Sequence, residues 1–308
     1  MRPFLPLAAA SLVFSTALIA ADAAPPGPPR MDPAMMAAIN TTLPLEGAPK
    51  AIPGPYATTS EPAFGVATLK TIRPANLDAF PKKDTLPVVV WSNGGCAMEN
   101  AKNQGFYETV ASHGFLVVTT ARPPADPAAA PGARPRSATA EDLKAAIDWA
   151  NAEDQRDGSP LKGKIATNEI AVMGQSCGGM LSVHLGGDAR VATIGVFNSG
   201  ATGNDTKEQI AALHGPVLLI NGGDRDPLMK LSRDTFDAIN NVPAFYGSRH
   251  GAGHTATMNH PGGGEWANVA SNWALWQLKG NKAAGKMFVG KKCGLCTNKN
   301  WDVEQKLK

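Results

Sequence analysis

The chain has 308 residues, of which 43% are hydrophobic and 18% are charged, and its formal net charge is +3. A chain of this length can bury a sizeable core in one domain or two. So small a positive charge, without a block of basic residues interleaved with aromatic ones, argues against a nucleic-acid partner.

The first 23 residues are typical of a secretory signal peptide. Arg2 precedes an apolar stretch, and residues 21–23 read Ala-Asp-Ala, the small-x-small pattern of a cleavage site. An uncleaved membrane anchor is the alternative, and no later segment approaches the ~20 apolar residues of a spanning helix. We therefore expect a secreted or periplasmic mature protein, monomeric and without membrane insertion.

Residues 24–62 are rich in Pro, Ala, Gly and Thr and show no sustained periodicity. This composition predicts an extended lead-in with one short helical piece near residues 32–40. Residues 63–308 are then expected to form a single domain. Its last part, from about residue 281, is a tail that contains two of the four cysteines.

Strands and helices are predicted to alternate through this domain. The expected strands cover residues 64–72, 86–93, 114–121, 169–174, 191–198, 216–222 and 243–248. The expected helices cover residues 100–112, 178–186, 206–213, 230–240 and 265–279, with one more that begins after Thr139. Because most strands are apolar throughout, we expect an α/β fold with a mostly parallel, doubly wound sheet and helices on both faces. In such sheets, functional residues gather at the carboxyl ends of the strands.

Gly174-Gln175-Ser176-Cys177-Gly178 fits G-x-S-x-G, the pattern of a nucleophile elbow. The five-residue pattern alone is weak evidence for such an elbow, but here an apolar strand precedes it and a helical segment follows it. Glycines leave room where neighbouring strands and helices pass too close for a Cβ, and the helix N-terminus aims its amides at charge that develops beside the serine. The sequence therefore predicts Ser176 as a nucleophile.

A nucleophilic serine needs a base and an orienting carboxylate. In a fold with this kind of elbow they follow the serine in the order Asp or Glu, then His. Asp224 and Asp226 follow one predicted strand; we choose Asp226 as the orienter, with Asp224 as its rival. After the last predicted strand, His254 is the preferred base and His250 its rival, whereas His260 is expected on the surface. The other histidines are expected to be solvated or bonded to the backbone: His113, His184 and His214.

An oxyanion that develops during acyl transfer needs two amide donors. One is predicted to belong to Cys177, directly after the nucleophile, and the other to Cys96, in the loop Asn93-Gly94-Gly95-Cys96. Two amides aimed at one oxygen place their α-carbons roughly within disulfide range. We therefore hypothesise a Cys96–Cys177 disulfide, and the alternative is two buried free thiols.

Cys293 and Cys296 form a C-x-x-C pair in the tail. Zinc would need a second pair of ligands, and a thioredoxin-like role would need the pair at a strand-to-helix junction. The tail supplies neither, so we expect a short structural disulfide there. We expect no metal and no organic cofactor.

Trp266, Trp273 and Trp276 share the last predicted helix. A carbohydrate-binding or aromatic-binding surface is one interpretation of three such side chains. Their helical spacing is more typical of a stripe that packs into the core.

Six stretches carry a family resemblance, in this order: VVVWSNGGC, ASHGFLVVTTA, GQSCGGM, GGDRDPL, GAGHTAT and WALWQLKG. With them the chain resembles secreted serine hydrolases of the α/β-hydrolase superfamily, near dienelactone hydrolases, chlorophyllases and bacterial cutinases or polyester hydrolases. The resemblance implies Ser176 as nucleophile, Asp226 as orienter and His254 as base. It also implies Cys96 and Cys177 at the oxyanion positions.

Two features differ from the polyester hydrolases of that family. They commonly carry an aromatic residue where this chain has Cys96, and a tryptophan where this chain has Asn198 and Ser199. The segment that follows is short and leaves no room for a large lid domain. We therefore expect an open cleft for fairly large esters, without an aromatic clamp for a polymer.

Together these features predict a serine esterase that cleaves a small-molecule or polymeric carboxylic ester through an acyl-enzyme, in the manner of a cutinase. A peptidase or an acyltransferase could use the same residues. A non-catalytic binding protein on a hydrolase scaffold is the third interpretation.

Overall fold

The computed structural model describes residues 33–34, 37, 47–123 and 136–307. The predicted signal peptide and about half of the predicted lead-in lie outside the described residues. The described residues belong to one compact unit. Pro33, Ala34 and Ala37 are helical, within the short helix expected near residues 32–40.

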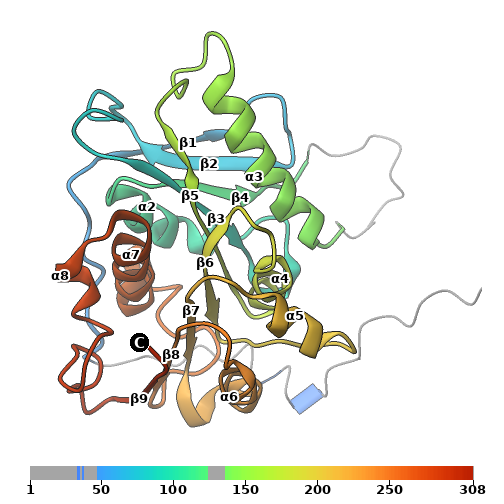
Figure 1. Ribbon diagram of the computed structural model, residues 1–308, viewed down its shortest axis with the longest axis vertical. Helices are drawn as coiled ribbons and strands as arrows, with labels where there is room; N and C mark the ends of the chain where they lie inside the picture. Colours follow the sequence, from blue (N-terminus) through green and yellow to red (C-terminus); the bar gives the residue numbers. More distant parts are fainter. Residues whose placement is uncertain (1–32, 35–36, 38–46, 124–135, 308) are drawn as a thin grey trace, which may run out of the picture. The chain divides into compact units, whose positions relative to one another are not determined.

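Within the described residues, nine strands form one sheet in the order β1-β2-β4-β3-β5-β6-β7-β8-β9 (Figure 1). The strands are β1 (Thr58–Pro62), β2 (Leu69–Pro74), β3 (Leu86–Ser92), β4 (Leu116–Thr120), β5 (Ile165–Gln175), β6 (Val191–Phe197), β7 (Val217–Asn221), β8 (Ala244–Arg249) and β9 (Trp301–Gln305). Strands β3 to β8 run parallel to one another. Strands β1, β2 and β9 add antiparallel pairings at the two ends. The prediction of an α/β fold with a mostly parallel sheet is confirmed.

The helices cover both faces of this sheet. They are α2 (Gln104–Ser112), α3 (Ala140–Gln155), α4 (Cys177–Leu185), α5 (Thr206–Ala212), α6 (Met229–Ala238), α7 (Gly264–Lys279) and α8 (Lys282–Gly285). Side chains alternate along β3, so Val88 and Val90 share one apolar core with residues of α3, α4, α5 and α6. Val89 and Trp91 lie in a second core with residues of α2 and α7. Both faces are therefore buried, as the continuous apolar strands predict.

The register of the parallel strands brings four chain segments together at the carboxyl ends of the strands. Gln175 at the end of β5 pairs with Phe197 at the end of β6, and Phe197 pairs with Ile220 of β7. Asn221 at the end of β7 pairs with Ser248 near the end of β8. The residues that directly follow these strands are therefore neighbours in space, although up to about eighty positions separate them in the chain.

The structure differs from the prediction at the two edges of the sheet. Residues 64–68 form the turn before β2 rather than the start of a strand, and Thr58–Pro62, assigned to the lead-in, form β1. The tail contributes α8 and β9, which no apolar pattern indicated. Both β1 and β9 lie at edges, where only part of each strand is buried, so their polar residues hide the strand pattern.

Among the described residues, no helix is both long enough and apolar enough to cross a membrane.

Candidate active site

Ser176 lies in the tight bend between β5 and α4. Its backbone has φ 55° and ψ −125°, a left-handed conformation that costs a non-glycine residue energy. A Cβ on Gly174 would lie 2.3 Å from the Gly178 carbonyl oxygen, and a Cβ on Gly178 would lie 2.1 Å from the Ser92 carbonyl oxygen. The glycines are therefore required by close packing, and the bend presents the half-buried Ser176 side chain at the edge of the sheet.

Three predicted side chains meet at the carboxyl ends of the strands, where they form a chain of hydrogen bonds. His254 Nε2 lies 2.8 Å from Ser176 Oγ, and His254 Nδ1 lies 2.8 Å from Asp226 Oδ1. Only 1% of His254 and 3% of Asp226 is exposed to solvent. The structure thus brings together a hydroxyl, an imidazole and a carboxylate, with the imidazole between the other two.

The Asp226 carboxylate accepts four hydrogen bonds, two at each oxygen. Oδ1 accepts from His254 and from the Leu228 amide at 3.0 Å, and Oδ2 accepts from Asn198 Nδ2 at 2.8 Å and from the Gly222 amide at 3.1 Å. Burial by itself would raise the pKa of Asp226, but the hydrogen bond and charge of His254, with Asn198 and Gly222, outweigh it and lower that pKa. The carboxylate therefore stays ionised although it is buried.

The loop that carries His254 is fastened to the elbow and to β7. Gln175 Nε2 donates to the His254 carbonyl oxygen at 2.9 Å, and the Gly253 amide donates to the Gly222 carbonyl oxygen at 2.9 Å. These contacts fix the backbone on both sides of the imidazole attachment point. The position of the ring is therefore set by the fold before any ligand arrives.

The rival residues lie outside this chain of hydrogen bonds. Asp224 is exposed and accepts from the Gly251 amide at 3.3 Å, which fits the expected role in the turn. His250 Nε2 lies 2.9 Å from Asp302 Oδ2 on β9. Half-buried His260 precedes a short 3-10 turn. Of the remaining histidines, His113 contacts the Ile52 carbonyl oxygen at 3.0 Å, while His184 and His214 are exposed.

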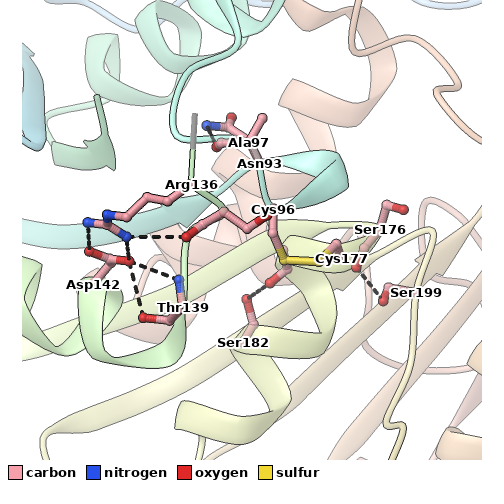
Figure 2. Close-up of a disulfide and its surroundings, with 12 residues drawn as sticks. Asn93, Cys96, Ala97, Arg136, Thr139, Asp142, Ser176, Cys177, Ser182 and Ser199 are labelled. Carbon is pink, nitrogen blue, oxygen red and sulfur yellow. Dashed lines mark hydrogen bonds and ion pairs between the residues drawn. A yellow bond between two sulfur atoms is a disulfide. The ribbon is translucent and has the colours of Figure 1, made fainter. Parts of the chain in front are cut away.

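A disulfide joins the loop after β3 to the first turn of α4 (Figure 2). It links Cys96 and Cys177, whose α-carbons lie 5.1 Å apart, so the hypothesis of this disulfide is confirmed over that of two free thiols. Cys177 is the first residue of α4, and within the described part of the chain its amide donates to no protein group. A donor is therefore available directly beside Ser176.

The Cys96 loop is also held from its far side. Asn93 Nδ2 donates to the Ala97 carbonyl oxygen at 3.1 Å and so closes the loop on itself, while Tyr107 OH of α2 donates to Asn93 Oδ1. The Ala138 amide donates to the Cys96 carbonyl oxygen at 2.7 Å. Burial raises the pKa of Tyr107, so its hydroxyl remains a proton donor. The loop is thereby fixed to α2, to the start of α3 and to the elbow.

Sequence reasoning missed the residues that orient the predicted ones. Asn198 donates to Asp226, and Gln175 donates to the His254 backbone. Tyr107 donates to Asn93 in the Cys96 loop. Asn198 directly follows β6, and Gln175 ends β5. A position at the end of a strand was the feature of the sequence that could have indicated Asn198 and Gln175. The partner of a buried amide depends on the packing of distant segments, which the sequence pattern does not give.

The C-x-x-C pair lies apart from these residues. Cys293 and Cys296 form a disulfide with α-carbons 4.9 Å apart, and Gln305 of β9 donates to Cys296 Sγ at 2.8 Å. Gln305 pairs with Phe245 near the start of β8, the opposite end from the candidate site. Among the described residues, no group of three or more His, Cys, Asp or Glu side chains is arranged to hold a metal ion.

The tryptophans of α7 pack into the protein. Trp266 and Trp273 are fully buried, and each donates its indole N–H to a side chain, at 2.9 Å in both cases: Trp266 to Asn198 and Trp273 to Thr193. Trp276 is partly buried and stacks on Phe288. The core interpretation is therefore confirmed for these side chains.

A scan against models of known protein families finds no match for this chain, and a search of curated proteins finds no similar sequence.

Proposed function

We propose that this protein is a serine hydrolase that cleaves carboxylic esters. The observation that carries the proposal is the continuous contact of Ser176 Oγ, the His254 ring and the Asp226 carboxylate, each link at 2.8 Å. These are the three chemical parts of a nucleophilic triad. The imidazole and the carboxylate are buried, and the low local dielectric there strengthens the interaction between their charges.

The order of the elements also supports a particular fold, that of the α/β-hydrolases. The nucleophile follows β5, the acid follows β7 and the base follows β8, which is the chain order Ser, Asp, His of that fold. The strands β5, β7 and β8 that carry these residues belong to the parallel part of the sheet, so their carboxyl ends lie together.

In the proposed reaction, His254 Nε2 accepts the proton of Ser176 Oγ while Oγ attacks the ester carbonyl carbon. The imidazolium that forms is stabilised by the ionised Asp226, and its Nδ1–H remains hydrogen-bonded to that carboxylate. His254 then gives the proton to the departing alkoxide, and an acyl-enzyme on Ser176 remains. A water molecule repeats the sequence and releases the carboxylic acid.

The oxyanion of each tetrahedral intermediate is stabilised by the amides of Cys177 and Cys96. The unpaired Cys177 amide at the N-terminus of α4 supports this role, because such amides carry partial positive charge. The disulfide between the two residues supports a fixed spacing of the two donors. Preorganised donors of this kind need no rearrangement when the charge develops.

An open cleft is the form of the site that the chain supports best. Only α5 lies between β6 and β7, so no large lid domain is inserted there. Asn198 and Ser199 follow β6, and both side chains bond within the protein, so no aromatic clamp stands at that position. Fairly large esters are therefore the proposed substrates, and a secreted or periplasmic location fits the two disulfides.

The proposal is tested with p-nitrophenyl esters graded by acyl length. We expect turnover by the purified protein, loss of turnover in Ser176→Ala, and covalent labelling of Ser176 by a fluorophosphonate probe. Failure of the wild-type protein both to label and to hydrolyse any ester would overturn the proposal. Preferential cleavage of peptides, or transfer to an alcohol acceptor, would replace the ester hydrolase with a peptidase or an acyltransferase.

A further inference from the structure

Asn198 directly follows β6 and lies at the centre of the candidate site. Its side chain is fully buried, and its backbone φ is 52°, a value that asparagine tolerates better than most residues. Nδ2 donates to Asp226 Oδ2 at 2.8 Å and to the Gly253 carbonyl oxygen at 3.2 Å. Oδ1 accepts the indole N–H of Trp266 at 2.9 Å.

These three partners allow only one orientation of the amide. A carboxylate and a backbone carbonyl accept hydrogen bonds, and an indole N–H only donates. Asn198 must therefore direct its nitrogen toward Asp226 and Gly253 and its oxygen toward Trp266. An aspartate at this position could not donate to both acceptors and would bring a second carboxylate against Asp226.

We propose that Asn198, held in place by Trp266, is a positioning residue that fixes both the carboxylate of Asp226 and the backbone beside His254. The proposal rests on the proposed function of the same site. From its own place after β6, the Asn198 side chain hydrogen-bonds to both the segment after β7 and the loop after β8. It thereby sets the angle at which the carboxylate meets the imidazole, and with it the distance from His254 Nε2 to Ser176 Oγ.

Helix α7 supplies a matched pair of variants for this proposal. Trp266 and Trp273 are both fully buried on the same helix, and both donate a 2.9 Å hydrogen bond. Trp266 donates to Asn198, just beyond the end of β6, whereas Trp273 donates to Thr193 near the start of that strand. Replacement by phenylalanine removes the same donor and the same volume from each, but only one change reaches the candidate site.

Asn198→Gly is the direct test, because glycine adopts a φ near 52° without strain and the change removes the side chain alone. We expect kcat for a p-nitrophenyl ester to fall about ten- to a hundredfold, the range by which loss of a residue that orients a metal ligand lowers activity. We expect KM to change less than about twofold, because the Asn198 side chain is fully buried.

Trp266→Phe is expected to lower kcat about fivefold, the effect of one lost hydrogen bond, and Trp273→Phe to leave kcat unchanged. Thermal unfolding is measured for both variants, and we expect similar losses of stability. Equal kcat values for the two variants would overturn the proposal, because their effects would then be those of packing alone. This comparison also decides the matter if Asn198→Gly does not fold.

A readout that needs no substrate separates this proposal from the proposed function. The proton between His254 Nδ1 and Asp226 is observed by ¹H NMR of protein labelled with ¹⁵N-histidine. We expect its resonance to shift or broaden in Asn198→Gly and Trp266→Phe, and to be unchanged in Trp273→Phe. An unchanged resonance in Asn198→Gly overturns the proposal even where ester turnover is normal. Absence of ester turnover by the wild-type protein overturns the proposed function and leaves the NMR result to judge Asn198.

Discussion

The two halves of the candidate site are held by different forces. The nucleophile half, with Ser176 and the Cys96 loop, is fixed by close packing around the elbow glycines and by a covalent bond from Cys96 to Cys177. The acid and base half, with Asp226 and His254, has no covalent cross-link among its residues, and its charged groups are fixed by hydrogen bonds between closely packed segments.

The difference follows from what each half does in the proposed reaction. The amides of the nucleophile half are neutral and keep their chemical state, so a rigid covalent frame suits them. The imidazole gains and loses a proton in each cycle, and only polar partners stabilise such a change of charge. A covalent or apolar support could hold the ring but could not keep Asp226 ionised beside it.

The largest expected effect comes from the acid and base half. Asp226→Asn leaves a side chain of the same shape, but it removes the charge that orients and stabilises the imidazolium. We expect kcat to fall about 10⁴-fold, the loss found on this change in a Ser-His-Asp enzyme. Steady-state hydrolysis of a p-nitrophenyl ester measures it.

Asp224→Asn is the control for that variant. Asp224 lies in the same turn, is exposed, and bonds to the Gly251 amide rather than to His254. We expect its kcat to stay within about twofold of the wild type, as for most surface changes. A loss in Asp224→Asn as large as in Asp226→Asn would show that the turn, not the Asp226 charge, is responsible.

The next largest effect tests the nucleophile half. The double variant Cys96→Ser, Cys177→Ser removes a disulfide that spans 81 positions, and we expect the free energy of unfolding to fall by about 2–4 kcal/mol. We expect kcat to fall about tenfold, less than the loss of an oxyanion donor, because the amides are loosened rather than removed. Urea unfolding and ester turnover measure the two effects.

The tail disulfide is the matched control. Cys293→Ser, Cys296→Ser removes a bond that closes a span of only 3 positions, at the other end of β8. We expect a loss of stability of no more than about 2 kcal/mol and an unchanged kcat. Equal losses of kcat in the two double variants would contradict a special role for the Cys96–Cys177 bond.

A smaller effect is expected from the hydrogen bond behind the Cys96 loop. Tyr107→Phe removes the hydroxyl that donates to Asn93, and the buried Asn93 oxygen then loses its closest donor. We expect the free energy of unfolding to fall by about 1 kcal/mol and kcat to fall two- to threefold. Wild-type kcat together with the expected loss of stability would show that the disulfide alone holds the loop.

The sequence predicted the residues that lie directly on the chain of hydrogen bonds, and the reason is topological. Ser176, Asp226 and His254 each follow a strand end, and in a parallel sheet those ends meet at one edge. Asn198 also follows a strand, but its role depends on Trp266, 68 positions away, and on which way a buried amide turns. Strand β9 was missed because its alternate residues are solvent-exposed, so no apolar run marks it.

Acid is expected to weaken the hydrogen-bonded half of the site before the covalent half. The pKa of Asp226 is lower in the folded protein than its ordinary value, which in unfolded chains is about 3.9. Its contribution to stability is therefore present above that unfolded pKa and is lost as the pH falls through the folded pKa.

The difference in free energy of unfolding between the wild type and Asp226→Asn should then shrink as the pH is lowered from 6 toward 3. The corresponding difference for the Cys96→Ser, Cys177→Ser variant should stay constant over the same range, because a disulfide does not titrate. Urea unfolding at a series of pH values tests both, and a pH-independent difference for Asp226→Asn would mean that the Asp226 charge contributes nothing to the fold.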